Sequence, residues 1–160
     1  MSLQQLLPAP ASSGRNLVRR RRSTLLAVSV ALVAGMFLSA CNPELENRDY
    51  SMVNSLRSSV GVGELSRSGE LNTKAQKQAD RMAAKGTIFH SKSLSSGVSA
   101  GWSRIGENVA MAGSIEDAQK ALENSPPHYE NMTNGAFTEM GVGVTVKNGT
   151  VYVVQVFVSR

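Results

Sequence analysis

Cysteine and histidine are scarce in this sequence: Cys41 is the single cysteine, and His90 and His128 are the two histidines among 160 residues. With one cysteine the chain cannot form an internal disulfide, so a fold of this length must rest on its hydrophobic core. If Cys41 is modified, as its context below indicates, a cysteine nucleophile and a thiolate metal site are excluded as well. The length fits one domain and is too short for two ordinary ones.

The chain also lacks an excess of charge once its first 40 residues are set aside. The formal net charge is +5, and five arginines near the N-terminus hold all of it. Removing these five from the 17 basic residues leaves 12, against 12 acidic residues. No basic stripe is then left to follow a phosphate backbone, so we expect no binding to nucleic acid. The five are Arg15, Arg19, Arg20, Arg21 and Arg22.

The arginine cluster precedes an uncharged apolar run, residues 23–40, and the two together are typical of an export signal. The alternative is a permanent transmembrane helix, since the run approaches the length that spans a bilayer. Leu38-Ser39-Ala40-Cys41 resembles the bacterial lipobox, in which small residues precede a cysteine that is lipidated before cleavage. We therefore predict that residues 1–40 are a lipoprotein signal peptide and that Cys41 carries the lipid. The protein would then be anchored on the outer side of a membrane of the bacterial cell envelope.

After the anchor, residues 41–48 are polar and predict a short tether, which is followed by a domain spanning residues 49–160. Asp49 is a plausible N-cap of a helix that Gly61 ends. A second helix starts at Ser66 or Ser68 and stops at Gly86, because apolar residues recur there every three or four positions. The serine-rich and glycine-rich residues 87–101 predict a loop.

The last third of the chain changes from helix to strand. Ser114 is the expected N-cap of a third helix, which ends at Ser125-Pro126-Pro127 because a residue before proline is pushed out of the helical region. Residues 136–146 and 150–159 alternate as strands, and Asn148-Gly149 between them is the signature of a type I′ hairpin. Helices followed by a hairpin predict an α+β domain with helices packed on a sheet.

Four polar residues are candidates for a site: His90, Glu107, His128 and Glu139. Each stands beside turn or loop residues, where functional side chains are often presented. Taken singly, each has an ordinary structural interpretation. The histidines are then solvated surface groups, Glu107 is a turn carboxylate, and Glu139 points to water from a strand.

In combination and in this order, these residues resemble the CAP superfamily, also called the SCP-like extracellular domain, in its compact bacterial form. The resemblance covers about residues 49–159 and is most specific in GENVA, in S-P-x-H followed by N-M, and in FTEMGVG. The matching residues are Asn54, Arg57, Leu65, Leu71, Ala75, Ala79, Met82, His90, Ser91, 106–110, Ser125, Pro126, His128, Asn131, Met132 and 137–143.

The resemblance implies an α-β-α sandwich with an antiparallel sheet and an open cleft lined by two histidines and carboxylates. Carried over residue by residue, the cleft positions are His90, His128 and Glu107. Some members hold a divalent metal ion in this cleft, and two imidazoles with a carboxylate are a fair partial shell for zinc.

Three functions remain open at this point. The first is a binding module for a metal ion, a lipid-like amphiphile or a cell-wall component. The second is a metal-assisted hydrolase or peptidase of the cell envelope that uses His90, His128 and Glu107; the third is a structural or adhesive domain. The sequence contains neither a G-x-S-x-G elbow nor an H-E-x-x-H helix, so only metal-bound water is available as a nucleophile, with Glu107 as its base. We therefore favour the binding module.

Overall fold

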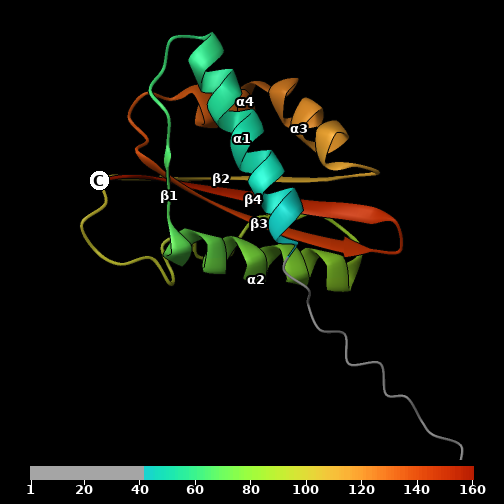
Figure 1. Ribbon diagram of the computed structural model, residues 1–160. Helices are drawn as coiled ribbons and strands as arrows, with labels where there is room; N and C mark the ends of the chain where they lie inside the picture. Colours follow the sequence, from blue (N-terminus) through green and yellow to red (C-terminus); the bar gives the residue numbers. More distant parts are fainter. Residues whose placement is uncertain (1–41) are drawn as a thin grey trace, which may run out of the picture. The chain divides into compact units, whose positions relative to one another are not determined.

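The computed structural model describes residues 42–160, which form one compact unit. Four helices and four strands follow one another along these residues (Figure 1). The helices are α1 (Pro43–Ser59), α2 (Gly69–Lys85), α3 (Ile115–Glu123) and α4 (Pro126–Thr133). The strands are β1 (Ser66–Arg67), β2 (Arg104–Ala112), β3 (Glu139–Lys147) and β4 (Thr150–Ser159). The predicted signal peptide and the lipidation of Cys41 lie outside the described residues.

The four strands form one sheet in the order β1-β3-β4-β2. β4 pairs antiparallel with β2 and with β3, as the hairpin signature predicts. The two-residue strand β1 instead runs parallel to β3, through the pairs Ser66↔Glu139 and Arg67↔Met140. The α+β prediction is therefore confirmed, while the expectation of a purely antiparallel sheet is wrong. A parallel pair needs a long crossover, and the segment between β1 and β3 provides one.

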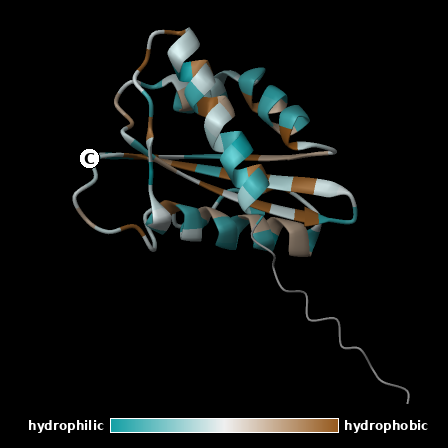
Figure 2. Ribbon diagram, in the orientation of Figure 1, coloured by the Kyte–Doolittle hydropathy of each residue, from teal (hydrophilic) through white to brown (hydrophobic). Residues whose placement is uncertain are grey.

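The sheet lies between two helical layers, as expected of an α-β-α sandwich. Figure 1 shows α2 on one face of the sheet and α1, α3 and α4 on the other. Hydrophobic residues run along β3 and β4, whereas hydrophilic residues cover much of α3 (Figure 2). Because both faces of β4 are covered, nine of its ten residues are buried, which accounts for its almost unbroken apolar sequence.

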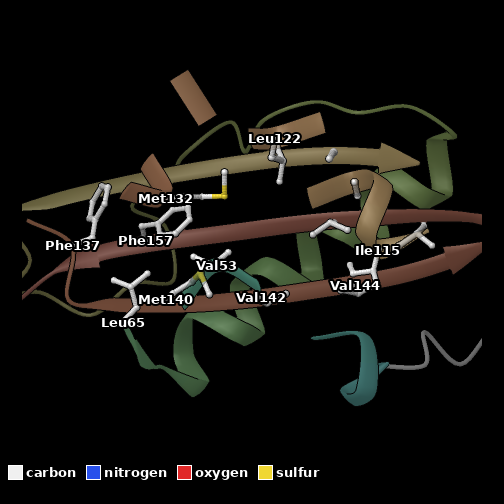
Figure 3. Close-up of a cluster of buried hydrophobic side chains, with 14 residues drawn as sticks. Val53, Leu65, Ile115, Leu122, Met132, Phe137, Met140, Val142, Val144 and Phe157 are labelled. Carbon is white, nitrogen blue, oxygen red and sulfur yellow. The ribbon is translucent and has the colours of Figure 1, made fainter. Parts of the chain in front are cut away.

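Two hydrophobic clusters fill the spaces on either side of the sheet. The first, drawn in Figure 3, joins Val53 of α1, Leu122 of α3 and Met132 of α4 to Phe157 of β4. The second packs α2 against the opposite face of the strands through Leu71, Ala75, Ala79, Met82, Val154, Val156 and Val158. Residues 42–160 therefore carry a core of their own, as an independently folding unit does.

Helix α2 approaches β3 so closely that glycine is required on the strand. A Cβ added at Gly141 or Gly143 would lie within 2.4 Å of α2 atoms, including backbone atoms of Leu71 and of Gln76. Gln76 and Asn72 of α2 also extend the sheet beyond the short strand β1. Their side-chain oxygens accept hydrogen bonds from the backbone N–H groups of β3, at Val144 (3.1 Å) and Val142 (2.9 Å).

The predicted start of the first helix is wrong. Helix α1 begins at Pro43, so residues 43–48 are helical and are not an extended tether. Proline fits the first turn because its missing N–H has no partner there, and Glu44 and Glu46 complement the positive end of the helix dipole. Asp49 is not a cap; it is a fully buried residue in the middle of α1.

Two elements near the candidate site were not fully predicted from the sequence patterns. The prolines that end α3 also begin a further helix, α4, with Pro126 in its first turn. Glu107 lies inside the nine-residue strand β2 and not in a turn. Glu107 and Asn108 interrupt the apolar run of β2, so a search for alternating apolar and polar residues does not detect this strand. The hairpin is as predicted, with positive φ at Asn148 (52°) and Gly149 (76°).

Candidate functional site

Strand β2 forms one edge of the sheet, and its successive residues face opposite helical layers. Val109 packs into the cluster beneath α2, while Ala110 packs into the cluster beneath α1, α3 and α4. Glu107 therefore faces the α2 layer and Asn108 the other. The loop after α2 brings His90 to Glu107, and α4 brings His128 to Asn108. The two histidines thus come from opposite layers and meet at the edge of the sheet.

The carboxylate of Glu107 accepts three hydrogen bonds from the start of the loop. Its Oε1 lies 2.9 Å from Nδ1 of His90 and 2.8 Å from the backbone nitrogen of Ser91. Its Oε2 accepts a bond of 2.5 Å from the Ser91 hydroxyl. The Glu107 side chain is only 2% exposed, whereas that of His90 is 57% exposed. Glu107 therefore acts from below the surface, where it holds the ring of the exposed His90 and the backbone N–H of Ser91.

The imidazole rings of His90 and His128 face the same small space, with ring centroids 6.3 Å apart and planes tilted by 38°. Partial burial, together with the charge of His90, lowers the pKa of His128. Both effects disfavour the imidazolium form. At neutral pH His128 is therefore the neutral imidazole, which is the form that binds metal ions.

A polar network of hydrogen bonds holds the backbone of His128 in place. The Asn108 amide donates to the backbone oxygen of His128 and to Oε1 of Gln155, both at 3.0 Å. Asn131 of α4 donates to Oδ1 of Asn108 at 2.9 Å. Gly106 leaves the room for Asn131, because a Cβ at that glycine would lie 2.9 Å from the Asn131 oxygen. The backbone of His128 is therefore tied directly to β2.

The network continues into the core through Gln155. Its amide donates to both carboxylate oxygens of Asp49, at 3.1 and 2.9 Å, and to Oε1 of Gln119 at 3.0 Å. Burial, partly offset by the hydrogen bond from Gln155, raises the pKa of Asp49 to about 7. Sequence reasoning missed Asp49, Gln119 and Gln155. The signal that could have found Gln155 is a single amide within the otherwise apolar run VYVVQVFV.

Three of the four predicted site residues come together: His90, Glu107 and His128. Glu139 does not join them. It lies on β3, which β4 separates from β2, and its carboxylate is 3.8 Å from the Arg160 guanidinium. Among residues 42–160, no group of three or more His, Cys, Asp and Glu side chains is arranged to hold a metal ion. Glu107 orients His90 through their contact of 2.9 Å, and a ligand shell of His90, His128 and Glu107 stays a prediction.

The donor set of His90, His128 and Glu107 at the edge of the sheet fits an open, weakly held ion better than a closed structural one. Zinc lies about 2 Å from a ligating nitrogen, so two imidazoles on one tetrahedral ion have centroids about 5 Å apart. The observed 6.3 Å is wider than this, and a small rotation of the exposed His90 ring would close the gap. Carboxylate–histidine pairs such as Glu107–His90 commonly support metal-binding imidazoles.

Comparison with known proteins places this geometry in context. The model of the cysteine-rich secretory protein family, CAP, matches residues 50–157. No curated protein sequence matches significantly. Helices of sufficient length and apolarity to cross a membrane do not occur among residues 42–160.

Several solved structures share the fold. An extracellular protein of Bacillus anthracis containing an SCP domain superposes with a TM-score of 0.62 at 23% identity, over 74% of this chain and 41% of that longer chain. An outer surface protein of Borrelia burgdorferi gives 0.64 at 20% identity, over 73% and 93% of the two chains. NaASP2, crystallised with Zn²⁺, gives 0.53 at 20% identity, over 73% and 80%.

Proposed function

The chain belongs to the cysteine-rich secretory protein (CAP) family, and from this premise we propose that it is an extracytoplasmic binding module. A lipid on Cys41 holds it at a bacterial membrane. Its edge site, defined as His90, His128 and the supporting Glu107, binds a divalent metal ion such as zinc and presents it to a ligand of the cell envelope. That ligand is a lipid-like amphiphile or a cell-wall component.

The observation that carries the metal proposal is the contact of 2.9 Å between Nδ1 of His90 and Oε1 of Glu107. A carboxylate at this distance favours the proton on Nδ1, so that Nε2 keeps its lone pair for a metal ion. His128 supplies a second neutral nitrogen within the same space. A bound ion would offer ligand oxygen atoms a Lewis-acidic point of attachment. The structure of NaASP2 with Zn²⁺ supports the choice of zinc as the ion to test.

The alternative function, a metal-assisted hydrolase or peptidase, needs a base that faces the attacking water. Glu107 is the available carboxylate at the edge site, but both of its oxygens already accept hydrogen bonds from residues 90–91. This arrangement supports binding over catalysis. Turnover of a peptide or cell-wall substrate by the zinc-loaded protein, lost in His128→Ala, would favour the hydrolase instead.

Zinc titration by calorimetry on residues 42–160 tests the metal proposal. His90→Ala and His128→Ala should each remove most of the affinity, because two ligands act on one ion. Both should unfold at nearly the parental temperature, since the side chains of partly exposed residues carry little stability. Glu107→Gln should retain both imidazoles but bind zinc about 10- to 100-fold more weakly, as is usual when the partner of a metal-binding histidine is lost.

A matched surface variant and stability measurements control for indirect effects on zinc binding. Glu130→Gln removes an exposed carboxylate of α4 close to His128 and should leave zinc affinity unchanged. If the double variant His90→Ala/His128→Ala binds zinc as the parent does, the edge site does not hold the ion. Unfolding of that variant under native conditions would give the histidines a structural role and refute the proposal.

Detergent partitioning of the full chain, expressed in a bacterium, tests the membrane anchor. The parent should enter the detergent phase, because two or more acyl chains bury enough methylene groups to hold a small domain on a membrane. Cys41→Ala should shift the protein towards the aqueous phase. Equal partitioning of parent and variant would mean that residues 23–40 themselves are the anchor and that lipidation is not required.

A further inference from the structure

Helix α2 carries a row of basic residues on one face. Lys74, Lys77 and Arg81 follow one another at three and four positions, which places them side by side along the helix. Lys92, from the loop after α2, faces the same space. These four residues and a segment of that loop line a pocket of about 420 Å³, here named the α2 pocket. The chain has no net charge from Cys41 onwards, yet the α2 pocket gathers four basic residues.

Lys74 fastens the loop that forms the other wall of the α2 pocket. Its ammonium group donates to the backbone oxygens of Ser93, at 3.2 Å, and Ser96, at 2.9 Å. Only 9% of Lys74 is exposed, so its ammonium group mainly holds the loop in place. Burial lowers the pKa of Lys74, and the charge of Arg81 lowers it further, against the opposing attraction of Glu107. Lys74 and Arg81 are thus close enough in this pocket to repel each other, although Glu107 attracts Lys74 more strongly.

The remaining basic groups of the α2 pocket are exposed. Lys77, Arg81 and Lys92 form none of the salt bridges found among residues 42–160. The α2 pocket contains one acidic residue, Glu70, whose oxygens bind Ser99 and Arg160. Four basic residues therefore face one carboxylate that already has partners of its own.

The other lining residues indicate what kind of anion fits. Each of the ten residues that line the α2 pocket is charged, hydroxyl-bearing or glycine, so an acyl chain would meet no apolar wall there. Serine and threonine hydroxyls beside lysine and arginine are donors that suit phosphate oxygens. The volume, about 420 Å³, lies within the range of small-molecule sites.

We propose that the α2 pocket binds a phosphate ester, with Lys77, Arg81 and Lys92 as its ligand-binding cations. The phosphate belongs either to a soluble ester or to a lipid headgroup, since both present the same oxygens. This site goes beyond the proposed metal-binding function and needs no metal ion. It adjoins the edge site, because Ser91 lines the α2 pocket and donates two hydrogen bonds to Glu107.

Calorimetry with inorganic pyrophosphate on residues 42–160, with a chelator present, tests the proposal. The parent should bind, more weakly as salt is added. The triple variant Lys77→Gln/Arg81→Gln/Lys92→Gln should bind at least about 100-fold more weakly, since one charge-assisted hydrogen bond corresponds to about tenfold in affinity. Its thermal unfolding should match the parent, because the three side chains are exposed.

The matched control removes the same charge from exposed residues outside the pocket: Lys85→Gln/Arg104→Gln/Lys120→Gln. It should bind pyrophosphate within about twofold of the parent. An equal loss in both triple variants would mean non-specific attraction and would overturn the site, as would a parent that does not bind. Loss of pyrophosphate binding in His90→Ala/His128→Ala would assign the anion to the edge site instead. A failure of zinc binding alone would leave the α2 pocket intact.

Two further binding measurements, with lipid vesicles and with duplex DNA, identify the source of the phosphate. Vesicles of phosphatidylcholine with phosphatidylglycerol should bind residues 42–160 more strongly than pure phosphatidylcholine if the ligand is a lipid headgroup, and the pocket variant should lose the difference. Binding of pyrophosphate without this preference supports a soluble ester. Duplex DNA that binds the parent and the control, but not the pocket variant, would make the partner a nucleic acid and refute the choice of a small phosphate ester.

Discussion

The buried carboxylate of Asp49 should make the stability of this domain fall as pH rises. Asp49 is fully buried, and burial raises its pKa from the ordinary 3.8 to about 7 in the folded protein. Because the folded state then holds this proton more tightly than the unfolded state, protonation favours folding. The contribution is fully present below pH 3.8 and is lost as pH rises through about 7. Asp49→Asn removes the titrating group and keeps a side chain of the same shape beside Gln155.

The size of the effect follows from the two pKa values. They differ by about three pH units, and each unit corresponds to about 1.4 kcal/mol, so ionisation of Asp49 costs the folded state about 4 kcal/mol. Between about pH 5 and about pH 8 the change is about 3 kcal/mol. This is a large fraction of the stability of an ordinary domain.

Urea unfolding of residues 42–160, at several values between about pH 5 and about pH 8, measures the effect. The free energy of unfolding of the parent, relative to Asp49→Asn at the same pH, should fall by about 3 kcal/mol over this range. The other groups with perturbed pKa values are present in both proteins and cancel in the difference; they are Glu46, Arg57, Glu70, Lys74 and His128. Glu130→Gln, which removes an exposed carboxylate, is the control and should follow the parent.

Two outcomes would refute this reasoning. If the parent and Asp49→Asn show the same pH dependence, Asp49 is ionised in the folded protein at about pH 5, and the amide of Gln155 compensates its burial in full. If the relative stability of the parent rises with pH, the folded state favours the carboxylate, and the pKa of Asp49 is lowered by folding. Either result would make the contact between Gln155 and Asp49 a strong charge-assisted bond.

Two further predictions concern the packing that positions the site. Gly143→Ala should destabilise the domain by about 3 kcal/mol, because its Cβ would lie 2.2 Å from the backbone nitrogen of Gln76 and the helix would have to move. Thermal unfolding measures this loss. The control is Gly113→Ala, which should cost little because the added Cβ meets open space. Arg57→Met should lower the free energy of unfolding, measured with urea, by about 3 kcal/mol or more. The buried guanidinium donates to several backbone oxygens, which methionine would leave without a donor. A loss below about 1 kcal/mol would contradict this role. The oxygens belong to Gly63, Met132, Asn134 and Phe137.

The sequence predicted part of the candidate site. His90, Glu107 and His128 were identified through a family resemblance, and the structure brings them together. Their roles were not equally predictable. Glu107 was expected in a turn, but it lies within a buried strand and supports the His90 ring. Its role as a metal ligand or a base stays a prediction. The groups that donate to the carboxylate oxygens of Glu107 lie 16 and 17 residues away in the chain, and spacing alone does not reveal them.

Local signals determined several elements of the fold. The apolar repeat of α2, the Ser114 cap of α3 and the Asn-Gly hairpin between β3 and β4 each depend on interactions within a few residues, so the sequence alone predicts them. The start of α1, the short parallel strand β1 and the strand β2 were missed. The two strands are stabilised by partners far along the chain, which overrode the local pattern. The start of α1 has local signals, a proline and two acidic residues in its first turn, that were overlooked.

Tertiary structure alone decided where the polar residues went. Asp49 resembles a helix cap in the sequence, yet it lies in the core because an amide 106 residues away donates to it. Lys74, Lys77 and Arg81 belong to a stretch of chain without net charge from Cys41 onwards, yet the helix and its loop gather them around one pocket. Local backbone preferences act over one turn, whereas burial and electrostatics act on whatever folding brings close together.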